Sequence, residues 1–347
     1  MTTTPAPAPL QAAIAALAHE RPLTQDGITA AFDVVMRGDA SQVQIAALLT
    51  GLRVRGESAE VVAGAASALR RAMVRLDLPQ HERIVDTCGT GGGSVGTFNI
   101  STAAALVAAG AGVRIAKHGN RSFTSKSGSA DVLEALGVSI DVDVEAMRRA
   151  YESAGIVFMF APRMHPAMRH VGPVRGELGI PTVMNIIGPL ANPASAGRQV
   201  IGVADAARVS VIADALAALG TVHSLVVHGA PGMDEISPLG PTRILEVRGS
   251  DITEWEADPD SIGSGVAQPS ELIGGTPAEN AELVRGCLAG TAPAGAIAAV
   301  VANAGAAVYV AGLAASLADG VKTAKAAIAN GSATAALERL RNALPRV

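Results

Sequence analysis

The sequence predicts an α/β protein in which a small all-helical domain is joined to a larger α/β domain with a mostly parallel central sheet flanked by helices. Two observations support that prediction. Residues 10–76 show only helical spacing of apolar side chains. Thr24 precedes the second helical run, and Ser41 and Ser58 stand where the N-caps of the next two helices are expected. From Arg83 onward, short apolar runs alternate with helical segments of ten or more residues, which is the pattern of βαβ units.

The predicted strands follow one another along the chain with helices between them. In chain order they are RIVDTC, VRIAKH, IVFMFAP, RQVIGVAD, HSLVVHG and TRILEVRG. Residues 277–343 are expected to be helical, and residues 165–190 form a further helical insertion. We therefore predict a helical domain of residues 1–76 and 165–190, and an α/β domain of residues 77–164 and 191–347.

Composition excludes several classes of protein. A net charge of −4 without blocks of like charge, and only eight aromatic residues in 347, argue against nucleic-acid or membrane-surface binding. The two cysteines, Cys88 and Cys287, rule out a disulfide framework and a four-thiolate zinc site. The Ala-rich stretch 294–318 carries Asn303 and Tyr309, so we expect a buried helix there. Because the N-terminus lacks a signal-peptide pattern, a cytoplasmic protein is expected.

A glycine-rich loop follows the first predicted strand, in DTCGTGGGSVGTFNIST, residues 86–102. Glycines let backbone amides approach an anion closely because no Cβ intervenes, and a helix beginning near Ser101 adds unpaired N–H groups. Asn99 and Thr102 add an amide and a hydroxyl at the same helix start. The segment has neither the Walker pattern nor a dinucleotide-binding fingerprint. It indicates a phosphate cradle, and an ordinary tight strand-to-helix turn is the alternative.

Lysine is scarce, with four residues in the chain against 23 arginines, and two of the four lie in one segment. Lys117 and Lys126, together with His118 and Arg121, make KHGNRSFTSKSGSADVLEALG a cationic turn rich in small hydroxyl side chains. Such a loop suits a flexible lid over a polyanion. A solvated surface loop is the alternative.

A third segment, HPAMRHVGPVRGELG followed by NIIGPLANP, carries His165, Arg169, His170 and Arg175. Arg175 lies ten residues after His165, close to three helical turns, so we expect the two side chains to project on nearby faces. An arginine in this place is able to clamp a substrate carboxylate through two hydrogen bonds. A surface helix with solvated cations is the alternative.

Adjacent carboxylates follow a later strand, in HGAPGMDEISPLGPT, residues 228–242. Asp234 and Glu235 suit Mg²⁺, a hard cation that binds oxygen and is usually shared with substrate phosphates, whereas a solvated acidic loop is the alternative. Two polyanion-binding loops, an acid pair and an arginine clamp together suggest transfer from a pyrophosphorylated donor. The sequence shows no H-E-x-x-H motif, no supportable Ser-His-Asp spacing and no zinc cluster.

These motifs together resemble the anthranilate phosphoribosyltransferase family, which has the nucleoside phosphorylase/phosphoribosyltransferase fold. The resemblance runs from GITAAFDVVMRGDASQVQIAALLTGLRVRGES to GGTPAENA and the VYVAG helix, and KHGNRS with DEIS is its specific part. It implies transfer of the phosphoribosyl group of 5-phosphoribosyl 1-pyrophosphate to the amine of anthranilate, in tryptophan synthesis. It also implies two Mg²⁺ ions per active site and a homodimer formed through the helical domain.

The resemblance implies a role for each matching residue. The residues expected to hold the donor are Gly89, Gly92, Gly93, Thr97, Asn99, Ile100, Ser101, Thr102, Lys117, His118, Gly119, Asn120, Arg121, Ser122, Phe123, Thr124, Ser125 and Ser129. The residues expected at anthranilate are Gly89, Asn120, His165, Arg175, Gly188 and Pro189. The residues expected at the metal are Ser101, Asp234 and Glu235, and those expected to act in catalysis are Arg175, Asn120 and Lys117.

One position of the glycine loop departs from the family pattern. The family usually reads GTGGD there, whereas this chain has Gly93 followed by Ser94. The departure removes a carboxylate that would lie beside the donor and its metal. We therefore expect it to change how tightly the second metal ion is held.

Two other functions stay open at this point. A pyrimidine nucleoside phosphorylase would share the fold and the anion site but would use free phosphate, and the KHGNRS loop with the Asp234–Glu235 pair favours the pyrophosphate donor instead. A nucleic-acid-binding relative without catalytic activity is disfavoured by the net charge of −4 and by the 2% aromatic content.

Overall fold

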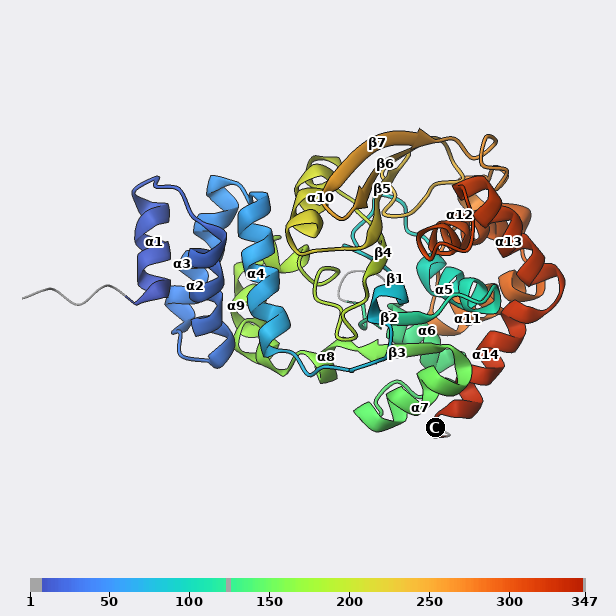
Figure 1. Cartoon of the computed structure of the whole chain (residues 1–347), viewed down its shortest axis with the longest axis horizontal. Helices are drawn as coiled ribbons and strands as arrows, with labels where there is room; N and C mark the ends of the chain where they lie inside the picture. Colours follow the sequence, from blue (N-terminus) through green and yellow to red (C-terminus); the bar gives the residue numbers. More distant parts are fainter. Residues whose placement is uncertain (1–7, 123–125, 346–347) are drawn as a thin grey trace, which may run out of the picture.

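The computed structural model describes residues 8–122 and 126–345, with a helical bundle at one end of the molecule and an α/β body at the other (Figure 1). The bundle contains α1 (Pro9–Ala18), α2 (Gln25–Arg37), α3 (Gln42–Arg55) and α4 (Ala59–Ala72). Ser41 and Ser58 each accept a hydrogen bond from the backbone N–H three residues later, so these two predicted N-caps are confirmed, and Thr24 caps α2 in the same way. Gly38 ends α2 in the left-handed conformation (φ 82°).

The α/β body is built on one seven-stranded sheet of order β3-β2-β1-β4-β5-β6-β7. Its strands are β1 (Val85–Gly89), β2 (Ile115–Gly119), β3 (Ile156–Phe160), β4 (Arg198–Gly202), β5 (His223–Gly229), β6 (Thr242–Arg248) and β7 (Asp251–Ala257). The pairs among β1 to β5 are parallel, and those of β6 with β5 and β7 are antiparallel. The prediction of an α/β fold with a mostly parallel sheet is therefore confirmed.

One strand of the sheet is absent from the predicted set. β7 pairs only with β6, and most of its side chains are exposed or half-buried, including the charged Asp251, Glu254 and Glu256. An edge strand with little burial carries no apolar run, and that run is the signal from which the other strands were predicted. Its partner β6 supplies the ladder of hydrogen bonds that defines it.

The register of the parallel strands brings their carboxyl ends to one edge of the sheet. Gly89, at the end of β1, pairs with Gly202 at the end of β4, and Gly119 of β2 pairs with Phe160 of β3. In open α/β sheets, ligands bind at this edge because the loops that follow the strands converge there. The glycine loop after β1 and the segment after β2 therefore start side by side.

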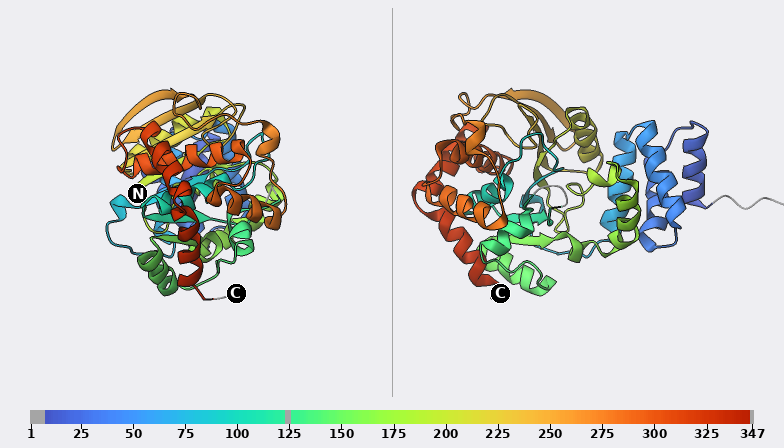
Figure 2. Two further views of the ribbon diagram at one scale, coloured as in Figure 1. Left: turned by 90° about the vertical axis from the view of Figure 1, so that its right-hand side faces the viewer. Right: turned by 180° about the vertical axis from the view of Figure 1, so that it is seen from behind.

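Helices cover both faces of the sheet, and each face belongs to a different hydrophobic core (Figure 2). The helices are α5 (Ile100–Gly110), α6 (Ser129–Ala135), α7 (Val144–Ala154), α10 (Val209–Ala218), α11 (Pro277–Ala289), α12 (Ala294–Val310), α13 (Leu317–Ala329) and α14 (Ser332–Ala343). Val200 and Leu225 point into the core that contains α5 and α12. Their neighbours Ile201 and Val226 point into the core shared with the bundle and α10. The bundle thus shares one core with α10 and with that face of the sheet, and α4 packs on α10.

The chain between β3 and β4 returns to the bundle through short helices. α8 (Ala161–Met164) and a 3₁₀ turn (Pro166–His170) precede α9 (Gly172–Leu178), and a second 3₁₀ turn (Val183–Asn185) follows. Because the segment is broken rather than one continuous helix, the expectation that spacing alone would place His165 and Arg175 on nearby faces of a helix is wrong. Pro166 and Pro173, each in the first turn of its element, account for the breaks.

Among the residues that the structure describes, no single helix is long and apolar enough to cross a membrane. α11 and α12 reach that length and composition only as a pair, and they are bent by 74°.

The crossing of α12 and α13 depends on two facing glycines, Gly305 and Gly320. A Cβ added at Gly305 would lie 2.6 Å from the backbone nitrogen of Val321, so Gly305→Ala is expected to lower the free energy of unfolding by about 1–3 kcal/mol. Urea unfolding measures the change. Gly176→Ala is the matched control, because no atom lies within 4 Å of that Cβ, and its stability should be unchanged or slightly higher. Equal destabilisation of both variants would contradict the prediction.

Candidate active site

The glycine loop connects β1 to α5 at the carboxyl edge of the sheet. Gly91 and Gly92 have φ angles of 69° and 82°, which residues with a Cβ rarely adopt. The amide of Gly91 donates to Oδ2 of Asp234 (3.1 Å), and the amide of Ser94 donates to the carbonyl oxygen of Gly232 (3.0 Å). The glycine loop and the acid segment 231–235 therefore pack against each other.

Asp234 and Glu235 both lie at this edge and are half-buried. Oε1 of Glu235 accepts from the amide of Ser101 in the first turn of α5 (3.1 Å). Burial raises the pKa of Asp234, and burial together with the Asp234 charge raises the pKa of Glu235 to about 8. The alternative of a solvated acidic loop is wrong, because this carboxylate pair is largely removed from water.

Gly93 lies directly against the Asp234 carboxylate. A Cβ at position 93 would be 2.9 Å from Oδ1 of Asp234 and 3.4 Å from the carbonyl oxygen of Gly232. A carboxylate-bearing side chain at position 93 would therefore require Asp234 to move. The glycine found here leaves that space to Asp234.

Lys117 lies behind the start of α5 and not in a loop. Lys117 and His118 belong to β2 and are 3% and 9% exposed, so the prediction that they form part of a flexible cationic lid is wrong. The Lys117 ammonium donates to the carbonyl oxygen of Thr87 and to Oγ of Ser101 (3.3 Å). Burial lowers the pKa of Lys117, whereas the nearby Asp86 and Glu235 carboxylates oppose that shift.

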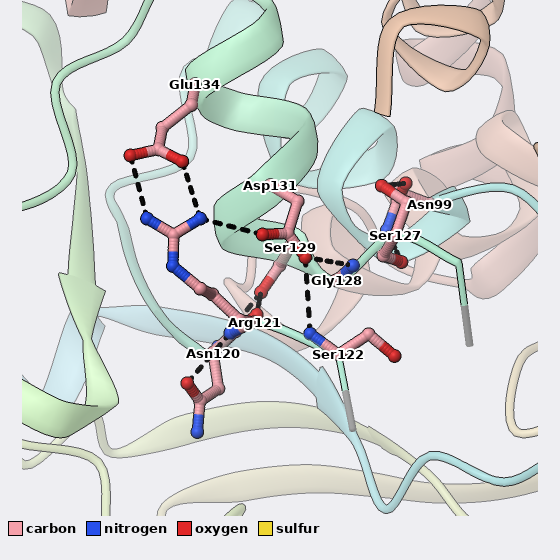
Figure 3. Close-up of polar contacts among 9 residues, drawn as sticks. All are labelled: Asn99, Asn120, Arg121, Ser122, Ser127, Gly128, Ser129, Asp131 and Glu134. Carbon is pink, nitrogen blue, oxygen red and sulfur yellow. Dashed lines mark hydrogen bonds and ion pairs between the residues drawn. The ribbon is translucent and has the colours of Figure 1, made fainter. Parts of the chain in front are cut away.

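Arg121 is held by two carboxylates of α6 (Figure 3). Its Nη1 donates to Oε2 of Glu134 (2.6 Å) and to Oδ1 of Asp131 (2.8 Å), and its Nη2 donates to Oε1 of Glu134 (2.9 Å). The guanidinium that the sequence assigns to a cationic turn is therefore already paired with two carboxylates. Its charge stabilises the loop conformation instead, because Asp131 also accepts from the amides of Gly128 and Ser122.

Asn99 joins the glycine loop to the segment after β2 (Figure 3). Its Nδ2 donates to the carbonyl oxygen of Ser127 (3.1 Å), and its Oδ1 accepts from Nδ2 of Asn280 (2.9 Å). Nearby, Oγ of Ser129 bonds with both the amide and the carbonyl oxygen of Asn120. Four more of the expected donor residues lie at the same edge, at the end of β1, in the first turn of α5 and at the end of β2: Gly89, Ile100, Thr102 and Gly119. Three others lie outside the described residues: Phe123, Thr124 and Ser125.

Two histidines meet beside the end of β2. Nε2 of His118 and Nε2 of His165 are 3.2 Å apart, which requires one ring to donate and the other to accept. Burial lowers the pKa of His165 to about 4, and burial together with His165 holds the pKa of His118 well below its usual value. Both rings are therefore neutral at pH 7. The sequence predicts both residues as site members but not their contact.

Arg175 and the segment of Gly188 and Pro189 lie on the bundle side. Arg175 is half-buried on α9, burial lowers its pKa, and no carboxylate of the described chain lies within 4.0 Å of it. Nε2 of Gln199 donates to the carbonyl oxygen of Pro189 (2.7 Å). No atom lies within 4 Å of a Cβ built on Gly188, so its backbone borders open space.

Comparison with known proteins identifies the family. A model of the α/β domain of a glycosyl transferase family matches residues 81–334, and a model of the helical-bundle domain of such a family matches residues 11–73. An anthranilate phosphoribosyltransferase from Rubrobacter xylanophilus is 50% identical over 95% of this chain and 96% of the relative. This chain belongs to the anthranilate phosphoribosyltransferase family.

Solved structures of the family agree with this assignment. The anthranilate phosphoribosyltransferase of Thermus thermophilus superposes with a TM-score of 0.90 at 41% identity, covering 95% of this chain and 98% of that one. The enzyme of Saccharomyces cerevisiae in complex with PRPP and Mg has a TM-score of 0.87 at 28% identity, covering 97% and 98%. The same yeast enzyme in complex with 4-fluoroanthranilate has a TM-score of 0.85 at 27% identity, covering 96% and 97%.

One buried acid beneath the candidate active site, Asp86, is not among the residues predicted from the sequence. Asp86 is fully buried in β1, accepts from Nδ2 of Asn192 (2.7 Å) and accepts from the amide of His118 (3.1 Å). Burial raises its pKa, and the Lys117 charge opposes that shift. A carboxylate inside a buried strand is rarely left without a partner. The position of Asp86 within the apolar run RIVDTC was therefore the signal that could have identified it as a paired, buried acid.

The pKa of about 4 for His165 predicts a ring that stays neutral across about pH 5.5–8. The unfolded-state value is near 6.5, so the stability that this neutral burial contributes is complete above that pH and is lost as the pH falls toward 4. A ¹H–¹³C NMR titration, with the ring signal assigned by His165→Gln, measures the pKa. A midpoint near 6.5 would contradict the prediction.

Proposed function

We propose that this protein transfers the phosphoribosyl group of 5-phosphoribosyl 1-pyrophosphate to the amine of anthranilate and releases pyrophosphate, within tryptophan synthesis. The observation that carries the proposal is the meeting of the glycine loop, the first turn of α5 and the Asp234–Glu235 pair at one edge of the sheet. The 50% identity to a relative named anthranilate phosphoribosyltransferase supports it, as do the yeast relatives bound to PRPP and Mg and to 4-fluoroanthranilate.

The donor is held by the backbone of the glycine loop, by the start of α5 and by the segment after β2. Amide groups and the partial positive charge of a helix N-terminus favour a pyrophosphate at that place. The residues proposed for the donor are Gly89, Gly92, Gly93, Thr97, Asn99, Ile100, Ser101, Thr102, His118, Gly119, Asn120, Ser122 and Ser129. Lys117 and Arg121 act indirectly. Lys117 orients the Ser101 hydroxyl, and Arg121 stabilises the loop.

Mg²⁺ fits the acid pair, and we assign Ser101, Asp234 and Glu235 to it, with two ions per site. The three side chains offer only oxygen, which Mg²⁺ prefers. Burying two carboxylates together raises both pKa values, and a divalent cation relieves the repulsion that causes part of this shift. When bound, Mg²⁺ supplies positive charge at the pyrophosphate oxygens.

The reaction breaks the bond between C1 of the ribose and the pyrophosphate oxygen. Loop amides aimed at the leaving group stabilise its growing negative charge, and one such donor contributes about 3–4 kcal/mol in comparable sites. The anthranilate amine is already neutral at pH 7, so it needs no strong base. Because His118 and His165 are neutral as well, they add no positive charge near a ribose that is itself becoming positive.

Anthranilate is held from the opposite side. The Arg175 guanidinium, which has no carboxylate partner in the described chain, clamps the anthranilate carboxylate through two hydrogen bonds. Gly89, Asn120, His165, Gly188 and Pro189 complete this acceptor side, and Asn120 assists Arg175 in holding the reacting groups close together.

The donor residues come from one part of the chain, whereas Arg175, His165, Gly188 and Pro189 of the acceptor side come from another, and we assign the two parts to two domains. Residues 1–76 and 165–190 form the helical domain, and residues 77–164 and 191–347 form the α/β domain. Closure of one on the other brings the amine to C1. We further propose a homodimer formed through the helical domain, and a cytoplasmic location.

Loss of anthranilate fluorescence tests the proposed activity. The purified protein is expected to consume anthranilate only when both 5-phosphoribosyl 1-pyrophosphate and Mg²⁺ are present. Phosphorolysis of thymidine, measured in parallel, is expected to be absent. Thymidine cleavage with unchanged anthranilate would replace the proposal with a nucleoside phosphorylase.

Arg175→Ala is expected to raise the KM for anthranilate by about 10- to 100-fold, the range that a charged hydrogen-bonding group supplies, and to leave the KM for the donor near its original value. Steady-state kinetics with each substrate varied in turn measure both constants. Arg169→Ala is the control, because Arg169 is exposed on the same segment. Equal increases in both constants would remove Arg175 from the acceptor side.

Asp234→Asn combined with Glu235→Gln is expected to lower kcat by about a thousandfold or more, since metal charge supplies several kcal/mol in such reactions. Both replacements keep the side-chain volume while removing the negative charge. Asp214→Asn, at an exposed acid on α10, should leave kcat unchanged. Mg²⁺-dependent turnover retained in the double variant would exclude these residues as ligands.

A further inference from the structure

A pocket of about 190 Å³ lies beside Asn192 and the turn that leads into β4. Four parts of the chain line it: Arg70 near the end of α4, His81 with Glu82, the 192–199 turn into β4, and residues 219–222 before β5. The pocket is therefore at the amino ends of β4 and β5, whereas the glycine loop is at the carboxyl edge. None of its lining residues belongs to the proposed donor, acceptor or metal sets.

Arg70 supplies this pocket with a positive charge and with N–H donors. Its side chain is mostly buried, and its Nε donates to the carbonyl oxygen of Leu190 (2.6 Å). No carboxylate of the described chain lies within 4.0 Å of the guanidinium. Its two terminal nitrogens have no hydrogen-bond partner among the described residues and are not sealed in the interior, which leaves them to the pocket. The next residue, Arg71, contrasts with it, being exposed and paired with Asp33 at 3.2 Å.

A guanidinium withdrawn from water without an acid partner is costly, and an oxyanion relieves that cost. The fork of N–H groups on Arg70 matches a carboxylate or a phosphate geometrically. The Thr221 hydroxyl also lines the pocket, but it already bonds with the Gly197 carbonyl oxygen (3.1 Å) and with the Ser224 hydroxyl (2.6 Å), so the free donors are those of Arg70. The one opposing charge among the lining residues is Glu82, whose side chain is 50% exposed and therefore well screened by solvent.

The Arg70 pocket is connected to the acceptor side by short hydrogen bonds. Arg70 holds the carbonyl oxygen of Leu190, and Gln199 holds that of Pro189. Asn192 holds both Asp86 (2.7 Å) and the carbonyl oxygen of Ala116 (2.9 Å). The segment 188–192 thus joins the two places: Asn192 lines the pocket, and Gly188 and Pro189, a few residues earlier in the chain, belong to the proposed acceptor site.

We propose that the Arg70 pocket binds a small oxyanion, a carboxylate or a phosphate, and that the bound anion changes the affinity of the acceptor site through the segment 188–192. The second part rests on the proposed role of Gly188 and Pro189 at anthranilate. The first part does not, because it concerns only binding at Arg70.

NMR of the arginine side chains tests the binding. The Arg70 Nε–H signal is assigned as the one lost in Arg70→Lys, and pyrophosphate with Mg²⁺ is kept in excess to occupy the donor cradle. Acetate and inorganic phosphate are titrated separately at constant ionic strength. A saturable shift of the Arg70 signal with either probe, at a Kd of about 1–10 mM, supports the site. The matched control, Arg71, should not shift. No saturable shift up to about 50 mM of both probes, or equal shifts at Arg71, overturns it.

A second variant keeps the test available if Arg70→Lys does not fold. Glu82→Gln removes the opposing charge at an exposed position and is expected to tighten anion binding about two- to threefold. Unchanged or weaker binding in that variant would contradict a site beside Glu82.

Kinetics test the coupling separately from the binding. Acetate at constant ionic strength is expected to change the KM for anthranilate about twofold or more while leaving the KM for the donor unchanged, and Arg70→Lys should abolish the effect. An acetate effect that survives in Arg70→Lys would be competition at the acceptor site and would overturn the coupling. Binding at Arg70 with an unchanged KM would overturn it too, while leaving the site itself intact.

Discussion

The carboxylate of Asp234, pressed against the glycine loop, organises the carboxyl edge of the sheet. It accepts from the amide of Gly91, and its own backbone packs so closely on β4 that a Cβ on Gly202 would lie 1.6 Å from its carbonyl oxygen. Gly93 leaves room for the same carboxylate. The loop conformation, the absence of side chains at these glycines and the position of the acid pair are therefore one constraint, and none of the three can change alone.

Around that contact the protein keeps several charges away from water. Asp86, Lys117, Asp234 and Glu235 lie within one connected region, in which Lys117 is the single ammonium among three carboxyl groups. Burial costs each of them free energy, and only hydrogen bonds and mutual attraction offset that cost. A site that receives a polyanion and divalent cations gains from such an arrangement, because the interacting groups are already desolvated and positioned before the ligands arrive.

The donor and acceptor sides are connected through the residues at the end of β2. His118 contacts His165 on the acceptor side, and its amide is held by Asp86, which also holds Asn192. The same Asn192 lines the Arg70 pocket. Hydrogen bonds between buried atoms therefore link the proposed donor and acceptor sides with that pocket.

The sequence by itself determined the class of most elements, the N-caps Ser41 and Ser58, the glycine loop before α5 and the adjacent acids after β5, because periodicity, capping and glycine placement are local properties. The tertiary structure decided which charges are available. Lys117 is turned behind Ser101, Arg121 is neutralised by Asp131 and Glu134, and Arg70 is left without a carboxylate. It also decided the meeting of His118 with His165 and the pairing of β7. Each of these depends on which distant segments pack together, and that information is carried by contacts across the fold and not by spacing along the chain.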